Sequence, residues 1–256
     1  MKKLLKTEAL PAQVLLLGLV AALLRTVLYL AAMDDKGLLI RSHPAHWLLW
    51  LITAAAAVLI VAVCRKLKGP NRYGDNFPSG ILPAAGCWIM AVGVVLTVVS
   101  GNAMPREGLV RIWKICGFVS GAGLIWAGVS RLRGQRPFVG VYALLCLFLA
   151  LQMVSRYQAW SGEPQSIHWI FSMLGAVGLT LTAYQHSAFC AGSGNRRLLL
   201  GTSLLTVFFC FAALAHTEYL ALYLCGGIWA FASLCRVTPP ARRKAAPAQE
   251  IPTETE

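Results

Sequence analysis

The sequence predicts an all-α fold, a polytopic membrane helix bundle of about eight transmembrane helices. Three observations predict it. First, 57% of the 256 residues are apolar and 13% are charged, with a mean hydropathy of +0.64, whereas a soluble domain averages about 45–50% apolar and about 25% charged residues. Second, the apolar residues fall in blocks of roughly the 20 residues that a spanning helix needs. Third, basic residues gather in alternate connections between these blocks.

The apolar blocks define the predicted helices in order along the chain. The first block is about two dozen residues long, which exceeds the apolar core of a cleaved signal peptide, so we expect a retained span. The last two blocks are separated only by His216 and Thr217, which requires a very tight hairpin. Residues 1–236 form one predicted transmembrane domain, and the polar segment 237–256 is predicted to be a disordered cytoplasmic tail. The predicted spans are 10–33, 46–64, 81–100, 109–130, 137–155, 167–189, 198–215 and 218–235.

The basic residues predict the orientation of these spans. Of the 23 Lys and Arg residues, sixteen lie in one alternating set of connections and six lie in the other. With eight spans, this alternation holds at every connection. The positive-inside rule then places the richer set, with both termini, in the cytoplasm. The richer set lies in segments 2–6, 65–72, 131–136, 196–197 and 236–244.

Missing motifs exclude several classes of function. The chain has no P-loop, Rossmann glycine pattern, HExxH or GxSxG motif, so we expect no cofactor and assign no catalytic residue. No Asp or Glu lies deep in a predicted span, which disfavours an ordinary proton-driven pump. The net charge of +13 falls in short clusters without a reading motif, so nucleic acid is not an expected partner. The eight cysteines form no CxxC pair and are predicted to be free thiols.

Small residues at helical spacing predict where helices approach closely. Gly117 and Gly121 lie in GxxxG register, and further glycines occur in the sixth and eighth predicted spans. Such residues let helix backbones come close together in lipid. Glycine-broken helices around a substrate are the alternative interpretation. The second and sixth predicted spans both begin with His-Trp, which suggests a duplication of two four-span halves.

Arg25 is the one charge well inside a predicted span. It lies eight residues before Met33 at the outer end of the first span, which is about 12 Å at 1.5 Å per residue. An arginine facing lipid at that depth costs about 2–3 kcal/mol or more, so we expect it to face the bundle and to have a partner. The candidate partners are Glu218, Asp34, Asp35, a backbone carbonyl or an anionic ligand. A structural and a ligand-binding role both stay open.

Other polar and aromatic residues are predicted at the same outer level. An interfacial aromatic belt explains such a group, and an outward-opening polar pocket for a small, anionic solute is the alternative. The residues predicted to form that pocket are Arg25, Tyr29, Arg156, Tyr157, His168 and Glu218. A metal site is the weaker hypothesis, because three or four ligands must converge and Pro44 interrupts the helix that would align an HxxH pair. Its ligands would be His43, His46 and His216.

The run RTVLYLAAMDDKGLLIRSHPAHW, followed by seven further predicted spans, resembles predicted multi-pass membrane proteins of unknown function from anaerobic Gram-positive bacteria. The resemblance covers mainly the first span and the loop after it. It implies a bacterial cell membrane and no particular activity.

Three hypotheses follow for the function of a chain whose expected environment is the lipid bilayer. The first is a transporter-like bundle that binds or passes a small anionic solute, with a cavity that reaches Arg25. The second is a non-catalytic structural or regulatory subunit that packs against a protein partner or a second copy, with Arg25 contacted by protein groups. The third is an intramembrane enzyme that uses the outer histidines, with two of them close to one another or to Glu218.

Overall fold

The computed structural model describes residues 9–32, 43–66, 71–77, 79–100, 107–160 and 169–235. This part of the chain is 86% helix and contains no strand, which confirms the predicted all-α class. The predicted tail, 237–256, lies outside the described residues. The helices are α1 (Leu10–Ala31), α2 (Pro44–Lys66), α3 (Tyr73–Asn76), α4 (Ile81–Ser100), α5 (Glu107–Leu132), α6 (Val139–Trp160), α7 (Ile170–Cys190), α8 (Arg196–Ala213) and α9 (Leu220–Leu234).

Proline, glycine and asparagine mark the ends of several helices. Pro11 lies in the first turn of α1, where a residue without a backbone N–H removes no helical hydrogen bond. The Asn195 side chain accepts a hydrogen bond from the Arg197 backbone N–H and so caps α8. The chain leaves α5 at Gly134 and α7 at Gly192, both with positive φ. Each glycine closes a Schellman motif, because the residue after it bonds back to the carbonyl five residues earlier.

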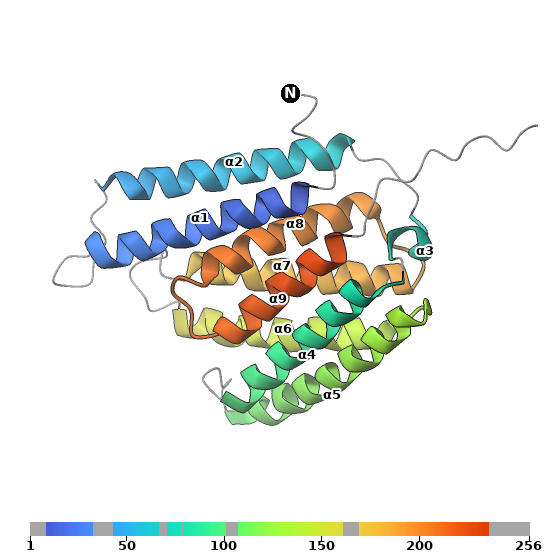
Figure 1. Cartoon of the computed structure of the whole chain (residues 1–256). Helices are drawn as coiled ribbons and strands as arrows, with labels where there is room; N and C mark the ends of the chain where they lie inside the picture. Colours follow the sequence, from blue (N-terminus) through green and yellow to red (C-terminus); the bar gives the residue numbers. More distant parts are fainter. Residues whose placement is uncertain are drawn as a thin grey trace, which may run out of the picture.

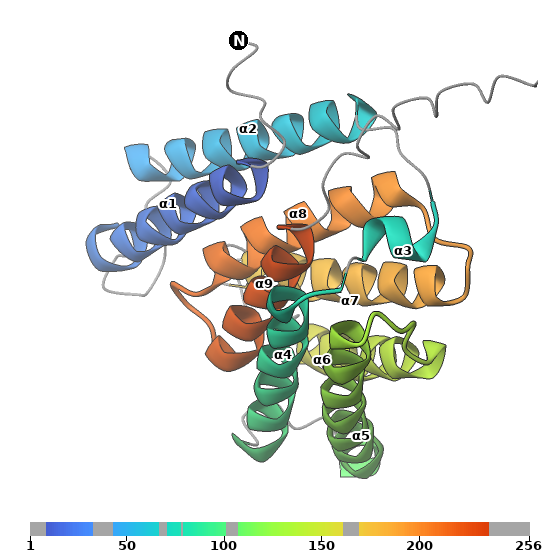
Figure 2. The ribbon, with the colours of Figure 1, turned by 45° about the vertical axis from the view of Figure 1, so that its right-hand side comes forward.

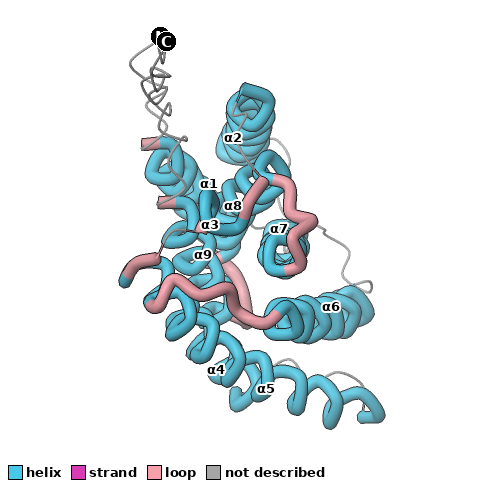
Figure 3. The backbone as a smooth tube through the Cα atoms, turned by 90° about the vertical axis from the view of Figure 1, so that its right-hand side faces the viewer, coloured by secondary structure: helices cyan, strands magenta, loops and turns pink. Residues whose placement is uncertain are grey.

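The long helices run back and forth, so their termini gather at two opposite sides of the bundle (Figure 1). We call the end that carries α3 the α3 end, and the opposite end the Arg25 end. Helix α1 begins and α9 finishes at the α3 end (Figure 1). Helices α1 and α2 lie together on one side, α4, α5 and α6 lie on the other, and α7, α8 and α9 lie between them (Figure 3). Helices α4 and α5 are steeply inclined to α1 and α2 (Figure 2).

Small residues allow the central helices to approach closely. A Cβ atom on Gly93 of α4 would lie 2.5 Å from Cys225 Cβ of α9, and one on Gly178 of α7 would lie 2.8 Å from Thr206 Oγ1 of α8. Thr206 also shares a buried hydrogen bond of 2.9 Å with Thr182 of α7. These contacts agree with the prediction that glycines mark close packing in lipid.

Within the described ranges, six helices are long and apolar enough to cross a membrane, namely α1, α2, α4, α5, α6 and α8. The described part of the chain therefore has the architecture of a membrane helix bundle. Helix α7 is as long as these but carries Gln185 and His186, whose side chains are buried in the bundle. Polar residues in a spanning helix are tolerated when they face protein. Helix α9 has 15 residues, which is about 22 Å of helix at 1.5 Å per residue.

The two predicted four-span halves pack differently. Helices α6 to α9 pack in succession, each on the next. In the first half, α1 and α2 pack on α8, whereas α4 and α5 pack on α9 and α6. The packing thus gives no support to a duplication.

Candidate functional site

Arg25 of α1 lies at the boundary between α1 and α8, and only 1% of its surface is exposed. Its Nη1 donates a hydrogen bond of 2.8 Å to the backbone carbonyl of Ala212. Helix α8 ends at Ala213, and the His216 N–H that would continue the α-helical pattern bonds to Ala213 instead of Ala212. Arg25 therefore caps one of the terminal carbonyls of a neighbouring helix. A cation is also favourable at the negative end of a helix dipole.

Aromatic rings surround the guanidinium of Arg25. Its central carbon lies 4.9 Å from the ring centroid of Phe171 on α7 and 5.8 Å from that of Tyr29. Nη2 lies 3.5 Å from the Tyr29 hydroxyl, and the Tyr29 ring stacks on His216 with centroids 4.3 Å apart. We call Arg25, Tyr29, Phe171, His216 and the Ala212 carbonyl the Arg25 cluster. Cation–π contacts of this kind stabilise a charge away from water.

Arg156 and Glu218 form an ion pair at the same end of the bundle. Arg156 also lies over the ring of Tyr219, 4.1 Å from its centroid. The Arg156 side chain is 11% exposed, whereas that of Glu218 is 63% exposed. Burial raises the pKa of Tyr219 above its ordinary value, so this phenol stays protonated beside the arginine. Of the two arginines predicted at this end, it is Arg156 that pairs with the carboxylate of Glu218.

The structure describes most of the other residues predicted for the outer site. Tyr157 is 54% exposed, and His168 lies outside the described residues. His43 accepts a hydrogen bond from the Ala45 N–H through Nδ1, and His46 contacts the edges of two tryptophan rings. Within the described ranges, no three His, Cys, Asp or Glu side chains converge on a point where a metal ion could be held. All eight cysteines are free thiols, as predicted.

A second buried arginine lies near the α3 end, at a place that the sequence does not single out. Arg131 of α5 is 3% exposed. Its guanidinium lies 4.8 Å from the ring centroid of Phe77, just after α3, and it interacts with the Tyr142 phenol of α6. In the sequence, Arg131 belongs to the RLRG cluster that sets the orientation, and hydropathy does not distinguish a solvated basic residue from a buried one. We call Arg131, Tyr142, His186, Trp229, Tyr73 and Phe77 the Arg131 cluster.

His186 of α7 is in the middle of this cluster. Its ring centroid lies 4.9 Å from Phe77, 5.2 Å from Tyr142 and 4.8 Å from Trp229. Its Nδ1 is 2.8 Å from the Thr182 carbonyl oxygen. Because a carbonyl only accepts, Nδ1 carries the proton, and Nε2 of the neutral ring is left with a lone pair. The polar run Tyr184-Gln185-His186 inside an apolar block was the available sequence signal for this site.

Several polar atoms of the Arg131 cluster have no hydrogen-bond partner within the described residues. They are Arg131 Nε and Nη2, the Tyr73 hydroxyl, Trp229 Nε1 and His186 Nε2, although the Tyr73 hydroxyl does lie close enough to the Arg131 guanidinium to interact with it. Burial raises the pKa of Tyr73 to about 12, so its hydroxyl remains a donor at neutral pH. The cluster thus holds three kinds of donor, one of them positively charged, and one acceptor. This combination suits a small oxyanion that carries a hydroxyl group, with its oxygens on the donors and its hydroxyl on His186.

No protein-family model matches the chain, and no curated protein or solved structure matches it at a significant level.

Proposed function

We propose that the chain is an eight-span protein of a bacterial cytoplasmic membrane, with both termini in the cytoplasm. Six of the eight predicted blocks coincide with described helices that are long and apolar enough to cross a membrane, and α7 and α9 occupy the other two blocks. The helix ends next to the Lys- and Arg-rich segments of the sequence lie at the α3 end, where α1 and α8 begin and α2, α5 and α9 finish. Reporter fusions after Arg133 and after Cys235 should behave as cytoplasmic, and a fusion at Asn102 as external. A cytoplasmic reporter at Asn102 would contradict this topology.

Within that bundle, we propose that the Arg131 cluster binds a small oxyanion, and that binding such a solute is the function of the chain. The supporting observation is Arg131, a 3% exposed arginine whose Nε and Nη2 make no well-formed hydrogen bond within the described residues, the Tyr73 hydroxyl being the polar group close to its guanidinium there. Ionisable groups inside a membrane protein usually mark substrate sites or pathways, because burying them otherwise costs free energy. The surrounding residues also favour an anion, because no Asp or Glu belongs to the cluster. The interaction with Tyr142 and the contact with Phe77 hold the guanidinium in place.

A ligand-dependent shift in thermal unfolding tests this proposal. The purified protein in detergent is heated with inorganic phosphate or with lactate. Chloride at the same ionic strength serves as the reference. Unfolding is followed with a thiol-reactive fluorogenic maleimide, which reports the exposure of buried cysteines such as Cys87 and Cys210. A ligand that binds only the folded state raises the midpoint with its concentration. We expect at least one oxyanion to do so in the wild type.

Matched variants decide whether the response comes from the Arg131 cluster. Arg131→Gln should abolish the shift, whereas Arg133→Gln, which removes an exposed charge two residues away, should retain it. Tyr73→Phe removes one hydroxyl and should weaken binding about tenfold, the effect of losing one hydrogen bond to a charged group. An oxyanion shift that is unchanged in both Arg131→Gln and Tyr73→Phe would overturn the proposal.

The outer pocket predicted around Arg25, Tyr29, Arg156, Tyr157, His168 and Glu218 is a second proposed position for the same solute. It is supported by the presence of two arginines, Arg25 and Arg156, at one end of the bundle. An oxyanion shift that survives Arg131→Gln but disappears in Arg156→Gln would place the solute there.

A structural or regulatory subunit is the second candidate function. It is supported by the contact between Arg25 and the Ala212 carbonyl, because a buried charge satisfied by protein needs no solute. It is also supported by α2, which packs mainly on α1 and α8 within the described bundle and exposes Trp47, Leu51 and Val58. This function requires a stable partner or a second copy, so cross-linking in membranes through cysteines placed on α2 tests it. A chain that remains a monomer at its native density in the membrane would exclude a homo-oligomer.

A further inference from the structure

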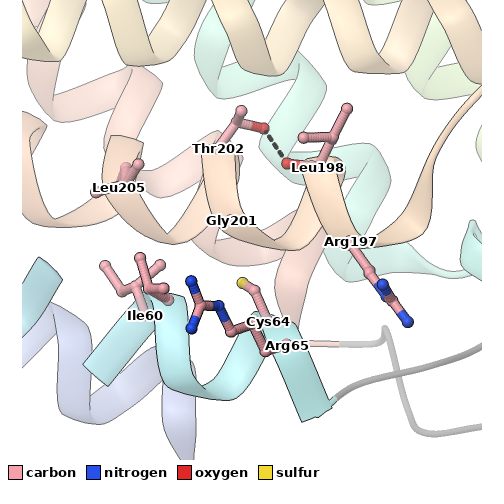
Figure 4. A pocket seen from close by; sticks show the side chains of 9 residues that line it. Ile60, Cys64, Arg65, Arg197, Leu198, Gly201, Thr202 and Leu205 are labelled. Carbon is pink, nitrogen blue, oxygen red and sulfur yellow. Dashed lines mark hydrogen bonds between the residues drawn. The ribbon is translucent and has the colours of Figure 1, made fainter. Parts of the chain in front are cut away.

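A groove between α2 and α8 lies near the α3 end of the bundle, away from the Arg131 cluster. It has a volume of about 320 Å³. Apolar side chains form its walls, with Ile60 and Val61 on α2 and Leu198 and Leu205 on α8. Arg65 and Arg197 complete the lining at the ends of the two helices. Figure 4 shows Arg65 running from the last turns of α2 back toward Ile60, and Arg197 extending from the first turn of α8 in the opposite direction.

The walls of the groove offer almost no polar group to an occupant. Thr202 is the one hydroxyl in the lining, and it donates to the Leu198 carbonyl of its own helix at 2.8 Å, as drawn in Figure 4. Gly201 leaves the middle of the groove open, since a Cβ there would meet only Cys64 Sγ, at 3.4 Å. From Arg197 to Leu205 the groove extends over eight residues of helix, which is about 12 Å. A chain of methylene groups suits such a surface, whereas a polar solute does not.

The arginines at the mouth of the groove carry a charge that the described protein does not neutralise. Arg65 and Arg197 are both exposed, and the single ion pair found within the described residues joins Arg156 and Glu218 instead. The first turn of α8 adds the positive end of a helix dipole to the same region. Because both arginines lie at helix ends, they lie at the depth of lipid headgroups when α2 and α8 cross a membrane.

We propose that this groove binds an anionic phospholipid. One acyl chain lies along Ile60, Leu198 and Leu205, and the phosphate of the headgroup lies between Arg65 and Arg197, whose exposed side chains turn toward it when the lipid binds. Basic pockets between spanning helices bind anionic headgroups by the same combination of charge and apolar surface. The occupant would join α2, which has few other neighbours, to the centre of the bundle through α8.

Native mass spectrometry of the full chain in detergent micelles tests the proposal. The fraction of protein with bound lipid is measured against added dioleoylphosphatidylglycerol and, separately, dioleoylphosphatidylcholine. We expect the anionic lipid to bind more tightly. Arg65→Gln combined with Arg197→Gln should weaken its binding about 30-fold, since each basic residue near an anionic headgroup contributes about fivefold. Arg72→Gln combined with Arg133→Gln removes two exposed charges at the same end and should leave the affinity within about twofold, because neither arginine lines the groove.

A second variant tests the apolar part of the site without changing its charge. Gly201→Phe fills the space beside Cys64 and should abolish tight binding of the anionic lipid while the protein keeps its thermal midpoint. Sn-glycerol 3-phosphate, a headgroup without acyl chains, should not compete at millimolar concentration. Equal binding of phosphatidylglycerol to the wild type and the Arg65/Arg197 variant would overturn the proposal. The proposal would also be overturned if glycerol phosphate displaced phosphatidylglycerol equally well from the wild type and from Gly201→Phe. The site would then bind free phosphates and not a lipid.

Discussion

Replacing Arg25 with leucine should destabilise the bundle. The change removes the 2.8 Å hydrogen bond to Ala212 and leaves a terminal carbonyl of α8 without its cap. A buried carbonyl that loses its partner costs about 1–3 kcal/mol, and the lost cation–π contacts with Phe171 and Tyr29 add about 0.5–2 kcal/mol. Leucine restores part of this by filling the space with apolar atoms. We therefore expect a net loss of about 2–4 kcal/mol in the free energy of unfolding.

Thermal unfolding in detergent, followed through the buried cysteines, measures this loss. For a chain of this size, 1 kcal/mol lowers the midpoint by about 2–4 °C, so Arg25→Leu should lower it by about 4–16 °C. Arg25→Lys keeps the charge but lacks the planar guanidinium, so its midpoint should lie between those of the wild type and Arg25→Leu. Leu30→Ala, on the same helix but 83% exposed, is the control and should change the midpoint little. If Arg25→Leu unfolds at the wild-type midpoint, the capping role assigned to Arg25 is wrong.

Two further substitutions test the packing and the surface charge. Gly93→Ala places a Cβ 2.5 Å from Cys225 Cβ, so α4 and α9 must separate. We expect the free energy of unfolding to fall by about 1–3 kcal/mol. Gly74→Ala is the control, because a Cβ there meets nothing within 4 Å, and it should leave the thermal midpoint unchanged. Glu218→Gln breaks the ion pair with Arg156, but the glutamate side chain is 63% exposed, so the midpoint should change by the equivalent of less than about 1 kcal/mol.

The positions of the helices could be predicted from the sequence because lipid imposes a simple rule on it. Each span must be apolar over a fixed length, and a break in that pattern marks a connection. The predicted block 81–100 and the helix α4 have the same bounds. The buried position of Arg25 followed from the same rule, because lipid does not solvate a charge at that depth.

The contacts of the buried arginines could not be predicted in the same way, because they depend on tertiary packing. A backbone carbonyl was one of several candidate partners for Arg25, and the choice required knowing that α8 ends beside it. Glu218 was another candidate, and it pairs with Arg156. The sequence predicts only that Arg131 marks the orientation of the chain. A basic residue at the end of an apolar block gives the same pattern whether its side chain is in water or is buried against Phe77, just after α3.

Arg25 and Arg131, two of the three arginines that are buried within the described residues, should respond in opposite directions to removal of their charge. Arg25 donates to a carbonyl that otherwise has no partner, so replacing it lowers stability. Arg131 retains two nitrogen atoms without a protein acceptor in the described structure, and a buried charge that is incompletely satisfied opposes folding. Arg131→Met should therefore raise the free energy of unfolding by about 1 kcal/mol, because apolar replacements of buried charges are often stabilising by about 1–4 kcal/mol and the lost contact with Tyr142 offsets part of the gain.

This difference separates a structural arginine from one held in place for a solute. A protein that keeps a destabilising charge in its interior usually needs it for function. Arg131→Met should thus give a higher thermal midpoint together with a lost response to phosphate or lactate, whereas Arg25→Leu should give a lower midpoint with the response retained at temperatures where the variant is folded. If Arg131→Met instead lowers the midpoint as much as Arg25→Leu does, Arg131 is a packing residue, and the oxyanion site proposed around it loses its main support.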